Sequence, residues 1–156
     1  MNNNIPDQSS EAIARVPKPH LSPPLDCTYC HAPVELTTHF SVYGRNYSDW
    51  PYMYRCTNPS CAASVGVHPG TYIPLGTLAD ERLRALRTDA KVPFQKLWFT
   101  KNSSKINRSR AYNKLAHHLR IPTTKCHFGM FNEQQCRKAK TWAIKMLKSL
   151  NRSDEI

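Results

Sequence analysis

The first half of the chain has the two-residue hydrophobic periodicity of β structure. From Val34 to Val42, apolar residues alternate with polar ones, which is typical of a half-buried strand. The Gly-Arg-Asn string at 44–46 predicts a turn after this strand. Residues 52–55 and 63–67 are short and rich in aromatic or β-branched side chains, and they predict two further strands.

In the second half, apolar residues recur every three or four positions, which predicts amphipathic helices. Thr77 and Asp80 form a capping box that is expected to open the first helix. Pro93 either ends this helix or restarts it as a second short one. The apolar stripe of the helix comprises Ala79, Leu83, Leu86 and Ala90.

Two longer helices are expected after a polar loop at 101–105. The first spans about 107–118, and Pro122 stops it. The second begins after Asn132, whose partner in a capping box is Gln135. Their apolar stripes comprise Tyr112, Leu115, Ala116 and Leu119 in the first helix, and Cys136, Ala139, Ala143, Met146 and Leu150 in the second.

The N-terminal segment differs from both halves in composition. Residues 1–25 contain five prolines and few large apolar groups, so we predict a disordered tail that cannot offset the entropy of ordering. This segment also lacks the basic start and apolar core of a secretory signal. No run approaches 18 apolar residues, which excludes a membrane-spanning helix and favours a cytoplasmic protein.

Four of the six cysteines form two closely spaced pairs. Two residues separate Cys27 from Cys30, four separate Cys56 from Cys61, and the predicted hairpin lies between the pairs. Such turns place thiolates around one Zn²⁺ at about 2.3 Å. We therefore predict a structural zinc ribbon with these four ligands and no open coordination position. Because the β module has little core, zinc should supply its folding energy, on the order of 10 kcal/mol.

Other interpretations of the cysteines remain open. Two disulfides are disfavoured in a cytoplasmic protein, and a redox Cys-x-x-Cys motif would need a βαβ context. A histidine could replace one sulfur, and the nearby histidines are His31, His39 and His68. Cys126 and Cys136 are expected to be buried small hydrophobic residues, with Cys136 in a hydrophobic staple with Phe131.

The net charge of +11 is concentrated in the second half. Residues 1–80 have a net charge of −2, whereas 81–156 hold eighteen bases against five acids, a net charge of +13. The segment 101–120 holds six bases and no acid. A field of one sign destabilises the fold by self-repulsion, which favours a polyanionic partner, DNA or RNA. An acidic protein partner and simple solubility are the alternatives.

The bases expected to contact nucleic acid lie mainly in the acid-free segment, and they are Lys101, Lys105, Arg108, Arg110 and Lys114. Together with the positive helix N-terminus near 107, they would bind phosphates. Arg45 is a further candidate because the tyrosines and the tryptophan around it could stack on unpaired bases. Alternatively, these aromatic rings cover the zinc knuckles and the helical module.

No motif in the chain requires catalysis. There is no Gly-rich phosphate loop, and no Ser or Cys nucleophile has a base at a motif spacing. His117 and His118 are adjacent on a predicted helix, point about 100° apart and cannot chelate one ion. A zinc-associated nuclease using His68, Asp80 and Glu81 is a minor alternative, because helix capping and the helix dipole explain the two acids.

Several strings carry a family resemblance: the two cysteine pairs, Val-Tyr-Gly-Arg at 42–45, VGVHPGT at 65–71 and PLGTLAD at 74–80, then 110–112, 115–116, 126–131 and Cys136. Over about residues 26–147 the chain resembles the phage and prophage zinc-finger-containing domain family, whose function is uncharacterised. The resemblance implies zinc on the four cysteines and a viral or prophage origin, and it implies no known activity. His31 departs from the small residue usual after the second cysteine of a zinc knuckle.

Together, these features predict an α+β fold. A small zinc-ribbon β module at 26–70 is expected to pack against a basic helical module of three to four helices at 77–150, and the short link favours one compact unit. We predict a non-catalytic protein that binds nucleic acid, mainly through phosphates, in the cytoplasm of a bacterial host. The alternative is a protein-interaction module that docks on and modulates a host enzyme, or a defence or replication complex.

Overall fold

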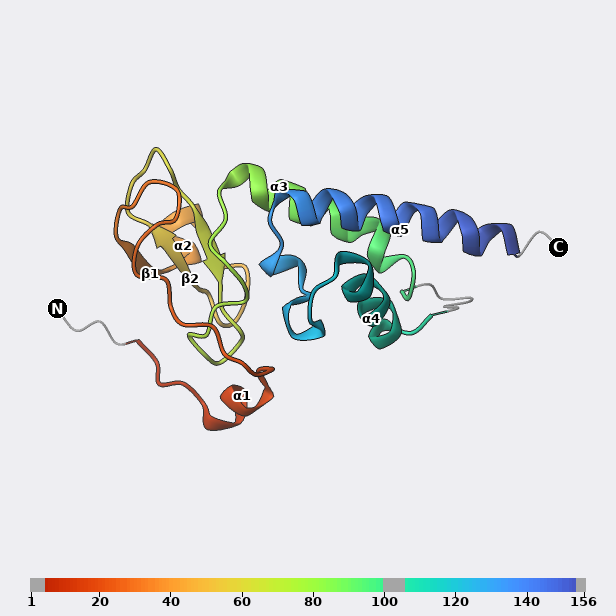
Figure 1. Ribbon diagram of the computed structural model, residues 1–156. Coiled ribbons are helices and arrows are strands. Elements are labelled where there is room, and N and C mark those ends of the chain that lie inside the picture. The colour runs from red at the N-terminus through yellow and green to blue at the C-terminus, as the bar shows by residue number, and fades with distance from the viewer. Residues whose placement is uncertain (1–4, 100–105, 154–156) are drawn as a thin grey trace. The chain divides into compact units, whose positions relative to one another are not determined.

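The computed structural model describes residues 5–99 and 106–153 and divides the chain into two compact units (Figure 1). The first unit is Met1–Glu81 and the second is Arg82–Ile156. Residues 70–81, which the sequence pattern predicts to be a link and the start of a helix, thus belong to the first unit. Within the described ranges, no helix is long and apolar enough to cross a membrane.

A three-stranded antiparallel sheet forms the centre of the first unit, in the order β1 (Val34–Thr38), β2 (Tyr52–Cys56) and β3 (Ser64–Gly66). β1 and β3 fall within segments that the sequence predicts to be extended, and β2 continues one residue beyond the predicted 52–55, to Cys56. Val34 lies opposite Cys56 in the register of β1 and β2. The register therefore brings the end of β2, and the cysteine on it, beside the segment that follows the first cysteine pair.

The first strand is shorter than its alternating pattern predicts. β1 ends at Thr38, and the short helix α2 (His39–Tyr43) replaces the expected extension to Val42. The Thr38 hydroxyl accepts a hydrogen bond from the Ser41 backbone N–H at 3.1 Å, which caps the helix. Gly44 then ends α2 in the left-handed conformation, with φ of 78°. Local capping thus competes successfully with a periodicity that also fits a strand.

The segment after β3 folds back along this strand. Val67 bridges to Pro74, and Ser64 exchanges two backbone hydrogen bonds with Ala79, at 2.9 and 3.0 Å. Because Ala79 pairs with a strand, it cannot join the helix that the Thr77–Asp80 capping box predicts. The helix α3 (Glu81–Gln95) accordingly begins later than that capping box predicts.

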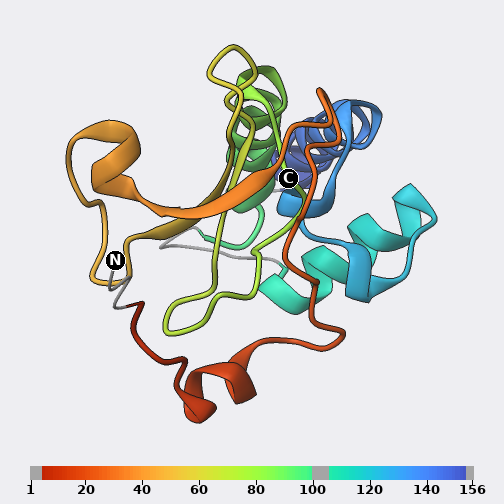
Figure 2. The same cartoon turned by 90° about the vertical axis from the view of Figure 1, so that its left-hand side faces the viewer.

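The predicted disordered tail contains an ordered helix, α1 (Ser10–Arg15), which Figure 2 shows at the bottom of the view in red. The Ser9 hydroxyl accepts a hydrogen bond from the backbone N–H of Ala12 at 3.3 Å. Ala12 is buried, and the backbone N–H of Ser9 donates to the Gly70 carbonyl at 3.2 Å. The structure differs from the expectation because a short apolar face finds a partner in the loop around Gly70.

The second unit contains the rest of α3, then α4 (Arg108–Leu119), the 3₁₀ turns η1 (Thr123–Lys125) and η2 (Phe128–Met130), and α5 (Glu133–Ser153). Pro93 neither ends α3 nor starts a new helix, but lies inside its last turn. The capping box of the last helix is confirmed: Gln135 N–H donates to the Asn132 side chain at 2.8 Å, and Asn132 N–H donates to the Gln135 side chain at 3.0 Å.

The second unit has its own hydrophobic core. Phe94 from α3, Leu115 from α4 and Phe131 are fully buried in it. Cys126 and Cys136 belong to the same core, which confirms their prediction as buried small residues. Because no other cysteine lies in this core, its packing does not depend on the two cysteine pairs of the first unit.

Candidate metal centre and cationic groove

The first unit brings the four paired cysteines into one cluster. All four Sγ atoms lie within 4.8 Å of one another. Cys27 Sγ and Cys61 Sγ are 3.6 Å apart, and Cys30 Sγ and Cys56 Sγ are 3.4 Å apart. A regular tetrahedron with sulfur–zinc bonds of about 2.3 Å has edges of about 3.8 Å. The sulfur positions therefore fit a tetrahedral Zn²⁺ and are too far apart for disulfide bonds.

The first knuckle is a tight turn that aims two thiols inward. The Tyr29 backbone N–H approaches Cys27 Sγ at 3.4 Å, and the His31 N–H donates to the Cys27 carbonyl at 2.9 Å. His31 adopts a left-handed conformation with φ of 65°. A small residue would adopt this conformation more easily, yet the turn closes with histidine present.

The second knuckle accommodates its two extra residues around Asn58. The Asn58 backbone N–H approaches Cys56 Sγ at 3.4 Å, the counterpart of the contact in the first knuckle. Its side chain accepts from the Ser60 N–H at 3.0 Å, and its carbonyl accepts from Cys61 and Ala62, both at 3.0 Å. Ala62 follows the second cysteine with φ of 54°, as His31 does in the first knuckle. The two knuckles thus present similar thiol pairs despite unequal spacing.

The cysteine cluster has the electrostatics of a site built for a cation. The backbone of Ala32 is the main cause that lowers the pKa of Cys30, to about 6. Burial, followed by contacts with the neighbouring sulfurs, raises the pKa of Cys56 to about 12. Thiols this close cannot all ionise beside one another without a positive charge between them. A divalent metal removes this competition because a coordinated thiol is deprotonated outright.

Histidine does not complete the cluster. Among the residues that the structure describes, the one group of three or more potential ligands is Cys27, Cys30, Cys56 and Cys61. The possible substitutes for a sulfur, His31, His39 and His68, are outside that group. The nuclease alternative likewise gains no support, since His68, Asp80 and Glu81 do not form such a group in the same described part of the chain.

The apolar surroundings of the cysteine cluster are small. Among its buried residues, Ala63 and Leu78 are the ones other than cysteine, and half-buried Val34 and Val65 pack against them. Such a core buries little surface, so a metal would supply much of the folding free energy of the first unit. Four thiolates would close the coordination sphere, which makes the site structural.

Two knuckles that bring four cysteine sulfurs together beside a small sheet define a tetracysteine metal-binding protein. The model of the zinc-finger-containing domain family matches residues 23–147, and the chain belongs to this family. No curated protein and no solved structure matches it significantly. The family and the cysteine cluster together indicate a bound metal ion, for which zinc is the natural candidate.

The bases predicted to contact phosphate divide between the two units. Arg108, Arg110 and Lys114 lie on α4 in the second unit, whereas Arg45 lies in the first and stacks over Tyr47, 4.5 Å from its ring centroid. Lys101 and Lys105 lie outside the described residues.

The three bases on α4 have different environments. Arg108 lies over Tyr112, 4.9 Å from the ring centroid, and 5.6 Å from that of Trp98, which gives it a packing role. Arg110 and Lys114 are exposed. Asn107 caps the helix by accepting from the Arg110 N–H at 2.8 Å, which satisfies one of the free N–H groups of the first turn.

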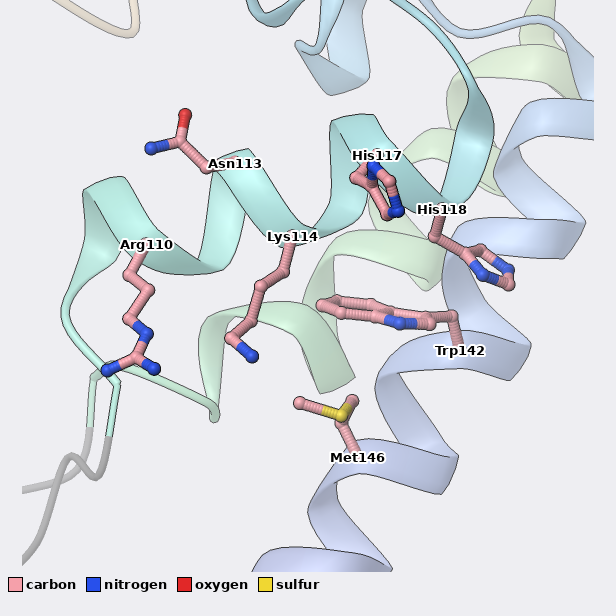
Figure 3. Close-up of a pocket in the computed structure, with 7 residues that line it drawn as sticks. All are labelled: Arg110, Asn113, Lys114, His117, His118, Trp142 and Met146. Carbon is pink, nitrogen blue, oxygen red and sulfur yellow. The ribbon is translucent and has the colours of Figure 1, made fainter.

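Arg110 and Lys114 border a groove of about 430 Å³ between α4 and α5, drawn in Figure 3. The residues that line it are Arg110, Asn113, Lys114, His117, His118, Trp142 and Met146. A smaller hollow of about 270 Å³ shares two of them and is lined by His118, Arg137, Lys138, Thr141, Trp142 and Lys145. We call the two together the cationic groove. None of these residues is acidic.

The two acids described in the second unit already have basic partners. Asp89 pairs with Lys140 at 2.5 Å, and Glu133 pairs with Arg82 and Arg137, each at 2.6 Å. The hydrogen bond from Arg137 is the first cause that lowers the pKa of Glu133. These pairs partly neutralise Arg137 and leave the other bases of the cationic groove to face solvent.

Sequence patterns indicate one side of this groove but not the other. Arg110 and Lys114 are found because they lie in a segment without acids, whereas Trp142, Lys138 and Lys145 carry no such signal. The groove residues supplied by α5 depend on which face of α5 packs against α4. Its one detectable sign in the sequence is a tryptophan beside the apolar stripe, flanked by lysines.

Proposed function

We propose that this protein is a zinc-stabilised, non-catalytic nucleic-acid-binding protein that acts mainly through phosphate contacts. The observation that carries the proposal is the cationic groove: Arg110 and Lys114 of α4 line one hollow, bases of α5 line the hollow that shares His118 and Trp142 with it, and neither lining contains an acid. Electrostatic attraction of this kind recognises the backbone of nucleic acid rather than its sequence. In this proposal the tetracysteine site, with zinc bound, holds the fold and takes no part in binding chemistry.

Charge reversal of the double variant Arg110→Glu, Lys114→Glu tests the proposal. If four phosphates are contacted, the logarithm of the binding constant should fall with the logarithm of salt concentration with a slope of about −3 to −4. The variant should bind labelled DNA or RNA at least about tenfold more weakly, with a slope closer to about −2. Because both side chains are exposed, the melting temperature should not change.

A matched control reverses two exposed bases of the first unit, Arg15→Glu with Lys18→Glu, and changes the net charge by the same amount. This control should lose much less affinity for nucleic acid than the groove variant does. Equal losses in the two double variants would show that only net charge matters, and undiminished binding by the groove variant would refute the proposed surface.

A protein-docking function is the second candidate, because three of the exposed aromatic side chains of the first unit lie close together in the sequence, at 40–47. Phe40 is 63% exposed, Tyr43 50% and Tyr47 58%, and the negative charge of this half disfavours a nucleic acid there. A host protein retained on the immobilised chain after nuclease treatment, and lost with Phe40→Ser and Tyr43→Ser, would support it. The phage or prophage origin stays a prediction of the family resemblance.

A further inference from the structure

We infer that the cationic groove holds an unpaired nucleobase against Trp142, so that the protein prefers single-stranded to double-stranded nucleic acid. This inference rests on the proposed function and adds to it the class of ligand. It combines two observations of the groove: an aromatic ring that lines both hollows, and the presence of cations in the lining of each hollow.

Trp142 occupies the middle of the groove. It lines both hollows, and the other residue that does so is His118. Figure 3 shows the indole extending from α5 into the space between the helices, with His117 and His118 above it and Met146 below. The rings of His118 and Trp142 are stacked with an interplanar angle of 29° and centroids 6.1 Å apart. Planar surfaces like these are the platforms on which proteins stack unpaired bases.

The hydrophobic core of the second unit packs against the Trp142 indole and restricts its motion. The centroid of the indole is 6.5 Å from that of Phe94, which is fully buried. Ala139 and Ala143, on neighbouring turns of α5, are also fully buried. A side chain fixed in this way loses little entropy when a ligand stacks on it, which favours binding.

Cations line both hollows that share the stacked pair. Arg110 and Lys114 line the larger hollow, one helical turn or about 6 Å apart along α4. Lys138 and Lys145 line the smaller hollow, two turns or about 10 Å apart along α5. A strand bound in the groove could therefore place a base on Trp142 and phosphates near the cations of both hollows.

The Trp142 ring would allow the groove to distinguish single-stranded nucleic acid from other anions. In a duplex the bases are paired and stacked inside the helix, so they reach Trp142 only after unstacking, which costs free energy. An acidic peptide could pair with the lysines and arginines, but its carboxylates would gain nothing from the indole face. We therefore favour single-stranded nucleic acid, and an acidic peptide becomes an outcome of the test.

The test measures the affinity of the full-length, zinc-loaded protein for four labelled ligands at equal salt. They are a twelve-nucleotide oligothymidylate, an abasic strand of the same length, a twelve-base-pair duplex and a glutamate-rich peptide. The oligothymidylate should bind about 5- to 100-fold more tightly than the abasic strand, the range expected for one stacked base. Trp142→Leu, which keeps apolar bulk for the contact with Phe94, should remove this advantage and weaken duplex binding far less than oligothymidylate binding.

Trp142→Phe is the conservative variant, and it should keep most of the difference in affinity between the oligothymidylate and the abasic strand. The oligothymidylate should also quench tryptophan fluorescence in the wild type and in Trp50→Phe, whose indole belongs to the first unit, but much less in Trp142→Phe. Loss of affinity for every ligand alike in Trp142→Leu would indicate a structural role and overturn the inference.

The remaining outcomes separate this inference from the proposed function. Equal binding of the oligothymidylate and the abasic strand, still weakened by Arg110→Glu with Lys114→Glu, would overturn the base site and leave phosphate binding intact. No binding of any nucleic acid at low salt would overturn both. Tighter binding of the glutamate-rich peptide, with the same dependence on Trp142, would overturn the single-strand preference and assign the groove to an acidic polypeptide.

Discussion

A single hydrogen atom in place of a side chain allows α1 to approach the loop at Gly70. A Cβ at this position would lie 2.7 Å from the Cβ of Ala12, closer than packed atoms allow. Gly70 also has φ of 76°, a conformation that costs other residues about 1–2 kcal/mol. The close contact explains why glycine occupies the loop in a string that carries the family resemblance.

We expect Gly70→Ala to lower the free energy of unfolding of the first unit by about 2–3 kcal/mol, as measured by urea titration. Gly44→Ala is the matched control, since Gly44 has φ of 78° but no atom within 4 Å of the position that a methyl group would take. The control should lower the free energy of unfolding only by the cost of placing alanine at positive φ, about 1 kcal/mol. Equal losses in the two variants would show that the approach of α1 is unimportant for stability.

Cys56 is the most informative single ligand because it lies both in the strand β2 and in the cysteine cluster. Cys56→Ser should abolish stoichiometric zinc binding and unfold the first unit, because three thiolates hold zinc far less tightly than four. Metal analysis and circular dichroism of the purified variant measure both effects. Cys136→Ala, in the core of the second unit, should keep its metal. A native spectrum of Cys56→Ser without metal would refute the zinc assignment.

At the level of residues, short spacing was enough to find the cysteine cluster but not the groove. Cys27 and Cys30 are separated by one turn, so their convergence is a local property that the sequence carries directly. Lys114 and Trp142 are 28 positions apart, and they share a groove because α4 packs on α5. Their proximity depends on the packing angle of two helices, which periodicity does not determine.

At the level of elements, capping groups explain both the successes and the errors. Asn132 and Gln135 mark the start of α5 correctly, since their hydrogen bonds are internal to the helix end. Thr77 and Asp80 fit the same motif, yet Ala79 pairs with Ser64 and delays α3 to Glu81. A capping motif therefore predicts a helix only where no strand competes for the backbone.

The six cysteines form two classes according to the elements that hold them. In the knuckles, a bound metal should protect four thiols from alkylation, and a chelator that removes the metal should make them reactive. In the helical core, burial raises the pKa of Cys126 to about 11 and also raises that of Cys136. At pH 8, Cys126 would therefore be almost entirely the unreactive thiol, and its burial also blocks access to it.

We therefore expect a stepwise count of thiols alkylated at pH 8, measured by mass spectrometry. The native zinc protein should react at none, the chelated protein at the four knuckle cysteines, and the denatured protein at all six. Above pH 10, Cys126 should become faster to react because its thiolate fraction rises. Rapid modification of Cys126 in the native protein at pH 8 would contradict its buried position.

At the level of the whole molecule, the two units derive their stability from different sources. The first combines a small sheet with the cysteine cluster, whereas the second buries aromatic and aliphatic side chains around Phe94 and Phe131. We expect a chelator to unfold the first unit while most of the helical circular dichroism, which comes from α3, α4 and α5, persists. A single cooperative loss of all structure on chelation would show that the second unit needs the first.

Two sulfur–sulfur contacts join opposite knuckles, Cys30 with Cys56 at 3.4 Å and Cys27 with Cys61 at 3.6 Å. If oxidation is faster than the unfolding that follows loss of the ion, these contacts would lead to crosslinks between the knuckles. Such bridges would tie residue 30 to 56 and residue 27 to 61, preserving the chain path that the ion maintained. Recovery would then require only a reductant and fresh metal, because the backbone would still follow its original course.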